Sequence, residues 1–205
     1  HRARVVTGHR VFIHGASGAV GLAAVQLAKD LGCYVVGTAG SVQGLDAVKQ
    51  SGADVTLNHR DADYLDKAKE SVAEGFDVIL EMAAHANLSA DFKIAGKRSC
   101  ICIIGSKSQE VGFNPRLPMV PEVDIRGVFL GTATPQERSE MHNALHDAMS
   151  RGALKPVVGM ELSLADAPKA HIEVMSPSSG GALGNIVLIP ENSDHERVKR
   201  ARSQL

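Results

Sequence analysis

Three regularly spaced glycines are the first residues of this chain that point to chemistry. Gly15, Gly18 and Gly21 form a G-x-x-G-x-x-G motif between a β-branched run and a segment of helical periodicity. In a dinucleotide-binding loop, such glycines permit a tight turn, a close backbone approach to the pyrophosphate, and close packing of helix on sheet. The N–H groups at the helix start would bind the anion. The motif therefore favours a dinucleotide site over its alternative, a purely structural turn.

A different kind of phosphate loop can be tested at the same place. A P-loop NTPase needs Gly-Lys followed by Ser or Thr, which reach the terminal phosphates and a magnesium ion. Leu22 and Ala23 follow Gly21 here. The sequence therefore does not predict a P-loop.

The turn after the second β-branched run indicates which dinucleotide would bind. NAD-selective sites place Asp or Glu about 20 residues after the first glycine, where it binds the ribose 2′-OH. This chain has Gly40 and Ser41 there, and no acid follows in that segment before Asp46. A 2′-phosphate can then lie against Gly40, Ser41 and the cationic pair His59 and Arg60. We predict NADP(H) rather than NAD(H); the alternative for the cationic pair is a solvated loop.

Short β-branched runs alternate with longer helical segments along the chain. This alternation is typical of βαβ units and of an α/β fold, a doubly wound parallel sheet with helices on both faces. In the first helical segment, Val20, Ala24, Leu27 and Leu31 share one face, which we expect to be buried. The six expected strands cover residues 10–14, 34–37, 54–57, 77–81, 98–104 and 124–130.

A shorter set of elements follows the sixth strand. Thr134, Pro135 and Glu137 predict a helix start with a capping box. Beyond that helix we expect a strand at 157–162, a helix at 164–175, a turn at 176–181 and a last strand at 185–189. Residues 1–190 are expected to form one NADP(H)-binding Rossmann domain, and the charged segment 191–205 a tail without chemistry.

Composition limits the partners and the compartment. The formal net charge is -1, with 22 Lys and Arg against 23 Asp and Glu, so no overall field favours nucleic acid or an anionic membrane. Cys33, Cys100 and Cys102 have neither disulfide-framework nor zinc-site spacing. Without an apolar run of about 18 residues or a signal peptide, we expect a cytoplasmic protein with reduced thiols and no membrane span.

Seven short segments, in order along the chain, carry a family resemblance. They are 11–21 (VFIHGASGAVG), 36–40 (VGTAG), 57–60 (LNHR), 79–82 (ILEM), 104–106 (IGS), 114–116 (NPR) and 154–157 (LKPV). Together they resemble the zeta-crystallin-like quinone oxidoreductases of the medium-chain dehydrogenase/reductase superfamily. The resemblance extends from about residue 4 to residue 189 and implies the Rossmann, nucleotide-binding half of such an enzyme.

The resemblance also implies contacts for each part of NADP(H). Segments near the carboxyl ends of the fifth and sixth strands lie where an open α/β sheet binds its ligands. Ala19 stands where relatives often carry glycine, and we expect its methyl group to be tolerated. The implied contacts are Ser17, Gly18, Ala19 and Val20 for the pyrophosphate, Gly40 and His59 near the 2′-phosphate, and Asn87, Ile104, Gly105, Ser106, Lys107, Val128, Phe129 and Leu130 for the adenine ribose, the nicotinamide ribose and the nicotinamide ring.

The implied activity is NADPH-dependent reduction of quinones, such as ortho-quinones, by hydride transfer without zinc, in a homo-oligomer (dimer or tetramer). In the family, a GroES-like catalytic domain precedes this half, and nothing in this chain, which opens at His1 rather than Met, corresponds to it. We therefore expect a fragment or processed product that is inactive or weakly active alone, and assign no catalytic acid or base. Strand 124–130 is expected to pair with a second subunit.

Two other functions can be compared with this one. A short-chain dehydrogenase needs Tyr-x-x-x-Lys, but Tyr34 and Tyr64 are followed four residues later by Thr38 and Ala68. An NADPH-responsive binding protein, with an RNA-binding or lens-structural role, is the alternative that the resemblance leaves open. Aromatic residues make up only 3% of the chain, and no stacking platform with interleaved basic residues is visible.

Overall fold

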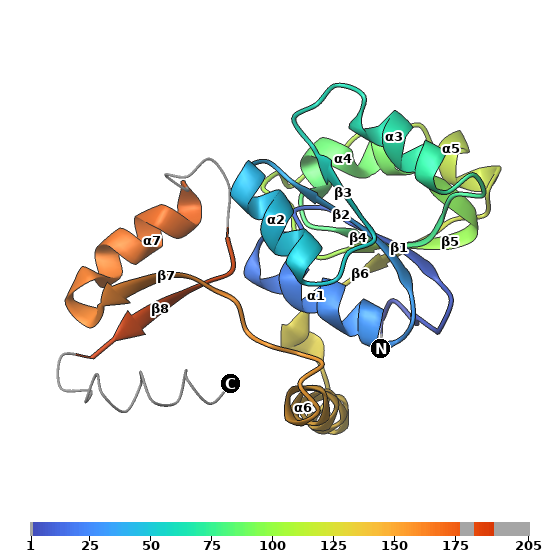
Figure 1. Ribbon diagram of the computed structural model, residues 1–205. Helices are drawn as coiled ribbons and strands as arrows, with labels where there is room; N and C mark the ends of the chain where they lie inside the picture. Colours follow the sequence, from blue (N-terminus) through green and yellow to red (C-terminus); the bar gives the residue numbers. More distant parts are fainter. Residues whose placement is uncertain (1, 177–182, 191–205) are drawn as a thin grey trace.

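The computed structural model describes residues 2–176 and 183–190, and its main body is one parallel sheet. Six strands lie in the order β3-β2-β1-β4-β5-β6, with every neighbouring pair parallel (Figure 1). The strands are β1 (Arg10–Ile13), β2 (Tyr34–Ala39), β3 (Val55–Asn58), β4 (Phe76–Glu81), β5 (Ala95–Ile103) and β6 (Asp124–Gly127). The helices that connect or follow them are α1 (Ala19–Asp30), α2 (Val42–Gln50), α3 (Tyr64–Ser71), α4 (Ala84–Asp91), α5 (Arg116–Met119) and α6 (Pro135–Ser150).

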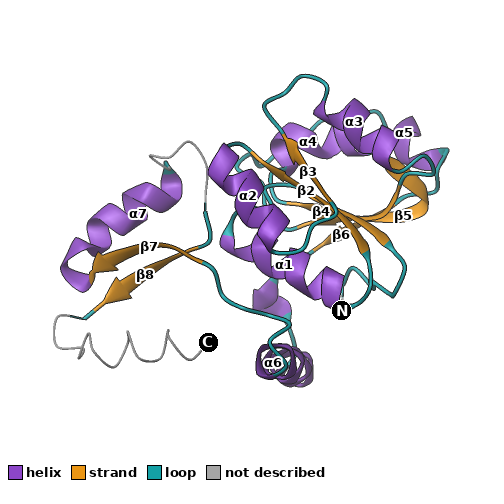
Figure 2. Cartoon of the chain, viewed as in Figure 1, coloured by secondary structure: helices purple, strands orange, loops and turns teal. Residues whose placement is uncertain are grey.

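Both faces of the central strands β1, β2 and β4 are buried, which explains why these strands read as near-continuous apolar runs. On one face, Val11 and Ile13 of β1 pack with Leu22 and Val25 of α1, together with residues of α2. On the other face, Phe12 of β1 packs with residues of α3 and α4. Figure 2 shows these helices flanking the strands. The doubly wound parallel α/β fold expected from the sequence is confirmed.

The strand order reverses at β1, which lies between β2 and β4. The connection after β2 leads outward to β3, whereas the chain crosses back to β4 on the other side of β1. At such a reversal the loops after two neighbouring strands diverge and leave a crevice at the carboxyl edge of the sheet. The loop after β1 contains Gly15 and Gly18, and Gly21 lies in the first turn of α1, so the glycine motif lies at this crevice.

A second, smaller unit follows α6. Strands β7 (Val158–Ser163) and β8 (Asn185–Ile189) form a two-stranded parallel sheet, with α7 (Ala167–Met175) between them in sequence (Figure 1). Its link to the main body includes Gly184, which bridges to Gly18, and whose N–H donates to the Ser17 carbonyl over 2.8 Å. The turn expected at 176–181 falls mostly, and the tail at 191–205 wholly, outside the described residues.

The buried face of α1 differs from the expected one. Val20 is 59% exposed and Leu31 46% exposed, whereas the buried residues are Gly21, Leu22, Val25 and Ala28. The reason is Gly21, which must face the preceding loop because a Cβ there would lie 2.5 Å from the Cα of Ala16. That contact sets the rotation of the helix about its axis, and the expected stripe is one residue out of phase.

Other boundaries also differ from the expected ones. The sixth strand ends at Gly127 rather than at 130, because β5 ends at Ile103 and the chain then enters a 3-10 turn at Leu130–Thr132. The helix expected at 164–175 is divided into a 3-10 turn, Leu164–Asp166, and α7. Pro168 in its first turn lacks an N–H to donate backward. Helix α4 was not expected, since its sequence, AHANLSAD, has little amphipathic contrast.

The helix start at α6 agrees with the sequence. Thr134 caps the helix, its Oγ1 accepting from the Glu137 N–H over 3.2 Å, and its own N–H donates to Glu137 Oε2 over 2.8 Å. The capping box is confirmed. No helix in residues 2–176 and 183–190 combines the length and apolarity needed to cross a bilayer.

Candidate nucleotide-binding site

The glycine loop is held in place by β2. Gly15 follows β1 with a φ of +55°, a left-handed conformation that glycine adopts without strain. Its N–H donates to Thr38 Oγ1 over 3.1 Å, and the N–H of Ala16 donates to the Thr38 carbonyl over 2.7 Å. The loop therefore has a fixed path across the crevice.

Helix α1 begins directly after this loop. Gly18 occupies the cap position and has no side chain to bind the free N–H groups of the first turn. The first turn also contains no acidic residue, so the positive end of the helix dipole is not neutralised there by its own side chains. Ser17 is buried, Gly18 and Ala19 are half-buried, and Val20 is exposed. Backbone N–H groups with this placement can bind a pyrophosphate.

The four residues expected near a 2′-phosphate meet beyond the end of β2. A Cβ added to Gly40 would lie 2.7 Å from His59 Nε2 and 3.1 Å from Arg60 Nε, so the side chains of these two basic residues lie directly against the Gly40 backbone. The His59 N–H donates to the Ala39 carbonyl over 3.2 Å. Ser41 caps α2, its Oγ accepting from the Gly44 N–H over 3.1 Å. The sequence-predicted set therefore lies together, with basic groups on one side and hydroxyl and amide groups on the other.

The charge of His59 depends on its surroundings. Partial desolvation of the ring lowers the pKa of His59 below its ordinary value, and the nearby charges of His14 and Arg60 act in the same direction. A bound dianion would act in the opposite direction and favour the protonated ring. The site is therefore suited to gain a positive charge when a phosphate binds.

A cavity of about 730 Å³ opens beyond the carboxyl ends of β5 and β6. Two of the sequence-predicted stretches meet in it, although Lys107 is not among its lining residues. Phe129 and Leu130 are largely exposed and form part of its apolar wall. A Cβ on Gly105 would lie 2.5 Å from the Met82 carbonyl oxygen, so only glycine fits at this wall. The lining residues from the two stretches are Ile104, Gly105, Ser106, Val128, Phe129 and Leu130.

Residues from outside the predicted set complete this cavity. Arg2, Glu137 and Met141 also line it, and Arg2 is tied to β6 because its Nε donates to the Gly127 carbonyl over 3.3 Å. Asn87 lies elsewhere, on α4, where its Nδ2 donates to Glu81 Oε1 over 3.3 Å. The predicted residues are thus divided among the glycine loop, the group formed by residues 40–41 and 59–60 (the 2′ corner), α4 and this cavity.

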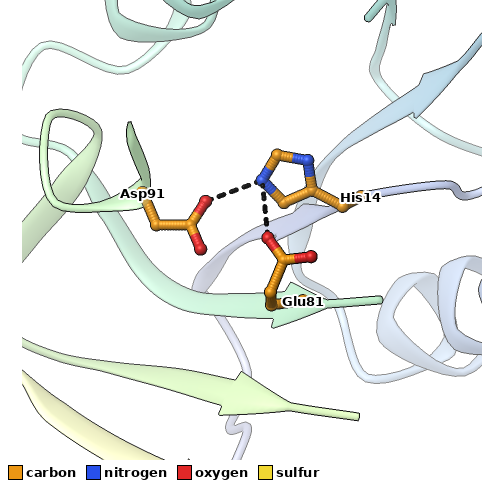
Figure 3. A group of neighbouring side chains, drawn as sticks. All are labelled: His14, Glu81 and Asp91. Atoms are coloured by element: carbon orange, nitrogen blue, oxygen red, sulfur yellow. Dashed lines mark hydrogen bonds and ion pairs between the residues drawn. The ribbon is translucent and has the colours of Figure 1, made fainter. Parts of the chain in front are cut away.

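Sequence reasoning missed a buried ionisable cluster at the crevice (Figure 3). His14 Nε2 lies 2.7 Å from Asp91 Oδ1 and 3.4 Å from Glu81 Oε2. His14 is 2% exposed, and the two carboxyl groups are fully buried. Desolvation raises the pKa of both Glu81 and Asp91 to about 7, and it lowers the pKa of His14. The signal that could have found the cluster is register, since His14 and Glu81 each come one residue after the paired Ile13 and Leu80.

The cluster does not have the geometry of a zinc site. Among the described residues it is the one group of three potential ligands, with ligand atoms within 4.8 Å of one another. Two ligands of a tetrahedral zinc ion, at 2.0–2.1 Å each, are about 3.3 Å apart. The 2.7 Å between His14 Nε2 and Asp91 Oδ1 is shorter and is the length of a hydrogen bond. The cluster is therefore hydrogen-bonded.

The three cysteines are free and buried. Cys100 Sγ and Cys102 Sγ lie 3.7 Å apart on β5, and burial raises the pKa of the Cys102 thiol to about 12. Burial likewise raises the pKa of Cys33. These residues are packed thiols rather than nucleophiles.

The glycine loop at the strand reversal, the uncapped helix start and the crevice at the carboxyl edge define a Rossmann-type nucleotide-binding domain. The chain belongs to the family described as zinc-binding dehydrogenase, whose profile matches residues 19–149. This assignment confirms the superfamily expected from the sequence.

Individual relatives agree with the family. The chain is 42% identical to a quinone oxidoreductase of Sus scrofa over 190 residues, and 40% identical to the quinone oxidoreductase of Homo sapiens over 190 residues. Each alignment covers 92% of this chain and 57% of the relative, so the chain spans little more than half the length of these relatives. The resemblance to quinone oxidoreductases is confirmed.

Two solved structures are similar in fold and were determined with NADPH. The Escherichia coli quinone oxidoreductase complexed with NADPH superimposes with a TM-score of 0.79 at 25% identity, covering 91% of this chain and 59% of that one. A mycobacterial protein complexed with NADPH gives a TM-score of 0.80 at 26% identity, with the same coverage of 91% and 59%. Both share the nucleotide-binding fold with this chain.

Proposed function

We propose that this chain is the NADP(H)-binding part of an oxidoreductase that reduces quinones. The observation that carries the proposal is the corner at Gly40, where bare backbone faces His59 and Arg60 and no acidic residue follows before Asp46. A carboxylate at this corner would bind the 2′-OH of NAD and repel a 2′-phosphate. The printed names of the relatives, quinone oxidoreductases, and the NADPH bound to two similar structures support the same assignment.

The proposed contacts divide the dinucleotide among the residues. NADPH supplies the hydride when it is bound, and the chain supplies binding, orientation and exclusion of water. Backbone N–H groups of residues 17–20 would bind the pyrophosphate, the corner at residues 40–41 and 59–60 the 2′-phosphate, and Asn87 the adenine ribose. The stretches 104–107 and 128–130 would hold the nicotinamide ribose and ring.

The cavity beyond β5 and β6 is our candidate for the quinone side of the site. Its wall includes Ile103, Val128, Phe129 and Leu130, which suit a flat, largely apolar ring beside the nicotinamide. Glu137 and Arg2 provide charged groups at its edge. The reaction we propose is zinc-independent, as the family resemblance implies.

Assembly and compartment are part of the same proposal. Strand β6 is one of the two outer strands of the main sheet, and the edge that faces away from β5 could pair with β6 of a second copy. We propose a homo-oligomer, a dimer or tetramer, in the cytoplasm. The division into a domain over residues 1–190 and a tail over 191–205 stays a prediction.

A fluorescence titration of the chain with NADPH and with NADH tests the cofactor assignment. We expect NADPH to bind at least about tenfold more tightly, a difference of about 1.4 kcal/mol. Equal affinities would refute it.

The reaction is tested by NADPH oxidation after addition of an ortho-quinone, using the longest form of the protein that its gene encodes. Quinone-dependent oxidation is expected. A salt-dependent shift of RNA in the absence of such oxidation would instead support the alternative, an NADPH-responsive binding protein.

A further inference from the structure

Three buried ionisable side chains lie beneath the proposed nucleotide site, and the proposed reaction does not use them. His14 follows β1, Glu81 ends β4, and Asp91 ends α4, so the cluster joins three elements (Figure 3). His14 directly precedes Gly15 of the glycine loop, and its N–H donates to the Leu80 carbonyl over 3.1 Å. The cluster therefore connects the glycine loop to the β4–α4 connection.

The surroundings of the cluster favour protonated rather than charged carboxyl groups. Glu81 Oε2 and Asp91 Oδ2 are buried oxygens that have no hydrogen-bond partner in the described part of the chain. Two such carboxylates close together would repel each other, and each would be costly to bury in its charged form. Asp91 is also the last residue of α4, where the negative end of the helix dipole disfavours a carboxylate. Protons on the cluster remove this conflict.

Glu81 extends the cluster to the nucleotide site. Its Oε1 accepts a hydrogen bond from the Ala83 N–H and a second from Asn87 Nδ2 over 3.3 Å. An amide whose nitrogen is bound to Glu81 has its oxygen on the opposite side, where it can accept from a ribose hydroxyl. The backbone carbonyl of Glu81 also accepts from the Ile104 N–H over 2.8 Å. One residue thus holds two of the segments proposed to contact the cofactor.

We propose that Glu81 is a positioning residue for the nucleotide, held by a proton shared within the His14–Glu81–Asp91 cluster, and that loss of this proton weakens nucleotide binding. The proposal rests on the proposed function in that the nucleotide is NADPH. Without the shared proton, the buried carboxylates repel, Glu81 shifts, and Asn87 loses its orientation.

Other titratable groups face the cluster from neighbouring elements. The Tyr64 ring, on α3, lies 6.5 Å from the His14 ring between centroids, and burial together with Asp91 and Glu81 raises the pKa of Tyr64. The charge of His14 contributes to the lowered pKa of His59, which follows β3. Neither group supplies a cation at neutral pH that could replace the shared proton.

The direction of the pH dependence follows from these pKa values. Glu81 and Asp91 have pKa values raised to about 7, so their contribution to stability is complete below about pH 4 and is lost as the pH rises towards 7. The lowered pKa of His14 acts in the opposite sense, because it costs stability as the pH falls below its ordinary value of 6.5. With two raised carboxyl groups against one histidine, alkaline conditions should loosen the cluster.

The test compares the wild-type chain with Glu81→Gln, which keeps an oxygen acceptor for Ala83 and Asn87 but carries no charge. The Kd for NADPH is measured by fluorescence from about pH 6 to about pH 9. We expect the wild-type Kd to rise at least about threefold more than that of Glu81→Gln over this range. His59 is present in both proteins, so its titration cancels. Asp77→Asn, which removes a carboxylate from the amino end of the same strand, should keep the wild-type profile.

A second measurement without nucleotide separates this proposal from the proposed function. The Tm of the free wild-type chain should fall relative to that of Glu81→Gln between about pH 5 and pH 8. If NADPH does not bind at any pH, the proposed function is wrong. The Tm comparison still tests the cluster in that case, because it is made without nucleotide. Asp91→Asn serves in the same way if Glu81→Gln does not fold. Parallel Kd profiles with parallel Tm profiles, or a stoichiometric metal ion in the purified protein, would overturn the proposal.

Discussion

Replacing Gly21 with alanine tests how the glycine loop and α1 are joined. The new Cβ would lie 2.5 Å from the Cα of Ala16 and 2.7 Å from its carbonyl carbon and oxygen. Carbon atoms in contact are normally about 3.5–4.0 Å apart, so the helix and the loop must separate by about 1 Å. Because the obstacle is buried backbone that cannot rotate away, we expect an overpacking cost at the upper end of its range, about 3 kcal/mol. Alanine regains about 1 kcal/mol of helix propensity, which leaves a net loss of about 2 kcal/mol in the free energy of unfolding.

Urea unfolding followed by circular dichroism measures this loss, and NADPH titration measures its effect on the site. A shift of about 1 Å takes backbone N–H groups out of hydrogen-bonding distance, so the Kd for NADPH should rise about tenfold. Gly112→Ala is the matched control, because nothing lies within 4 Å of its added Cβ. Its free energy of unfolding should stay within about 0.5 kcal/mol of wild type. If Gly21→Ala were as stable as this control and bound NADPH equally well, the reasoning would be wrong.

Three further predictions concern the 2′ corner, an ion pair and the thiols. Arg60→Ala should reduce the preference for NADPH over NADH about tenfold in fluorescence titrations. The control Arg98→Ala, which removes a cation paired with Glu122 just before β6, should leave this preference unchanged. If the two variants had the same ratio of NADH to NADPH affinity, Arg60 would not contact the 2′-phosphate. The Arg10 guanidinium lowers the pKa of Asp77 through two hydrogen bonds. Asp77→Asn should therefore reduce the free energy of unfolding in urea by about 2 kcal/mol at pH 7, and by less at pH 3, where the carboxylate begins to protonate and its stabilising effect is lost. An equal reduction at both pH values would contradict this. Native protein should react with Ellman's reagent slowly at all three buried cysteines and fully in denaturant, and a rapid reaction of native thiols would show that they are accessible.

The parts of the fold that could be predicted from sequence are those with a local cause. β-branched runs buried on both faces predict a parallel sheet, and the capping box at Thr134 predicts the start of α6. The glycine spacing predicts the loop at the strand reversal, because Gly15 adopts a left-handed φ and Gly21 packs against Ala16, and both requirements arise within a few residues. The corner at Gly40, His59 and Arg60 was also predicted, since parallel strands bring their carboxyl ends to one edge.

The parts that could not be predicted depend on contacts between elements. The rotation of α1 is set by Gly21 against Ala16, which an apolar stripe through Val20 and Leu31 does not reveal. Likewise, the length of β6 depends on where its neighbour β5 ends. The separation of Asn87 from the cavity depends on α4, whose sequence has little amphipathic contrast. In each case the deciding partner lies on another element.

The His14 cluster shows which further rule would have extended the prediction. Side chains alternate along a strand, so His14 shares a face with Phe12, and their ring centroids lie 4.8 Å apart. Glu81 shares the same face through Ile79, which is paired with Phe12. The strand order places β4 beside β1, with Ile13 paired to Leu80. The next residue on each strand, His14 and Glu81, must therefore meet on the face of the sheet that α3 and α4 cover. Two buried polar groups that meet in this way need a third partner or a shared proton, and Asp91, 77 residues from His14 in sequence, is the residue that α4 brings to them.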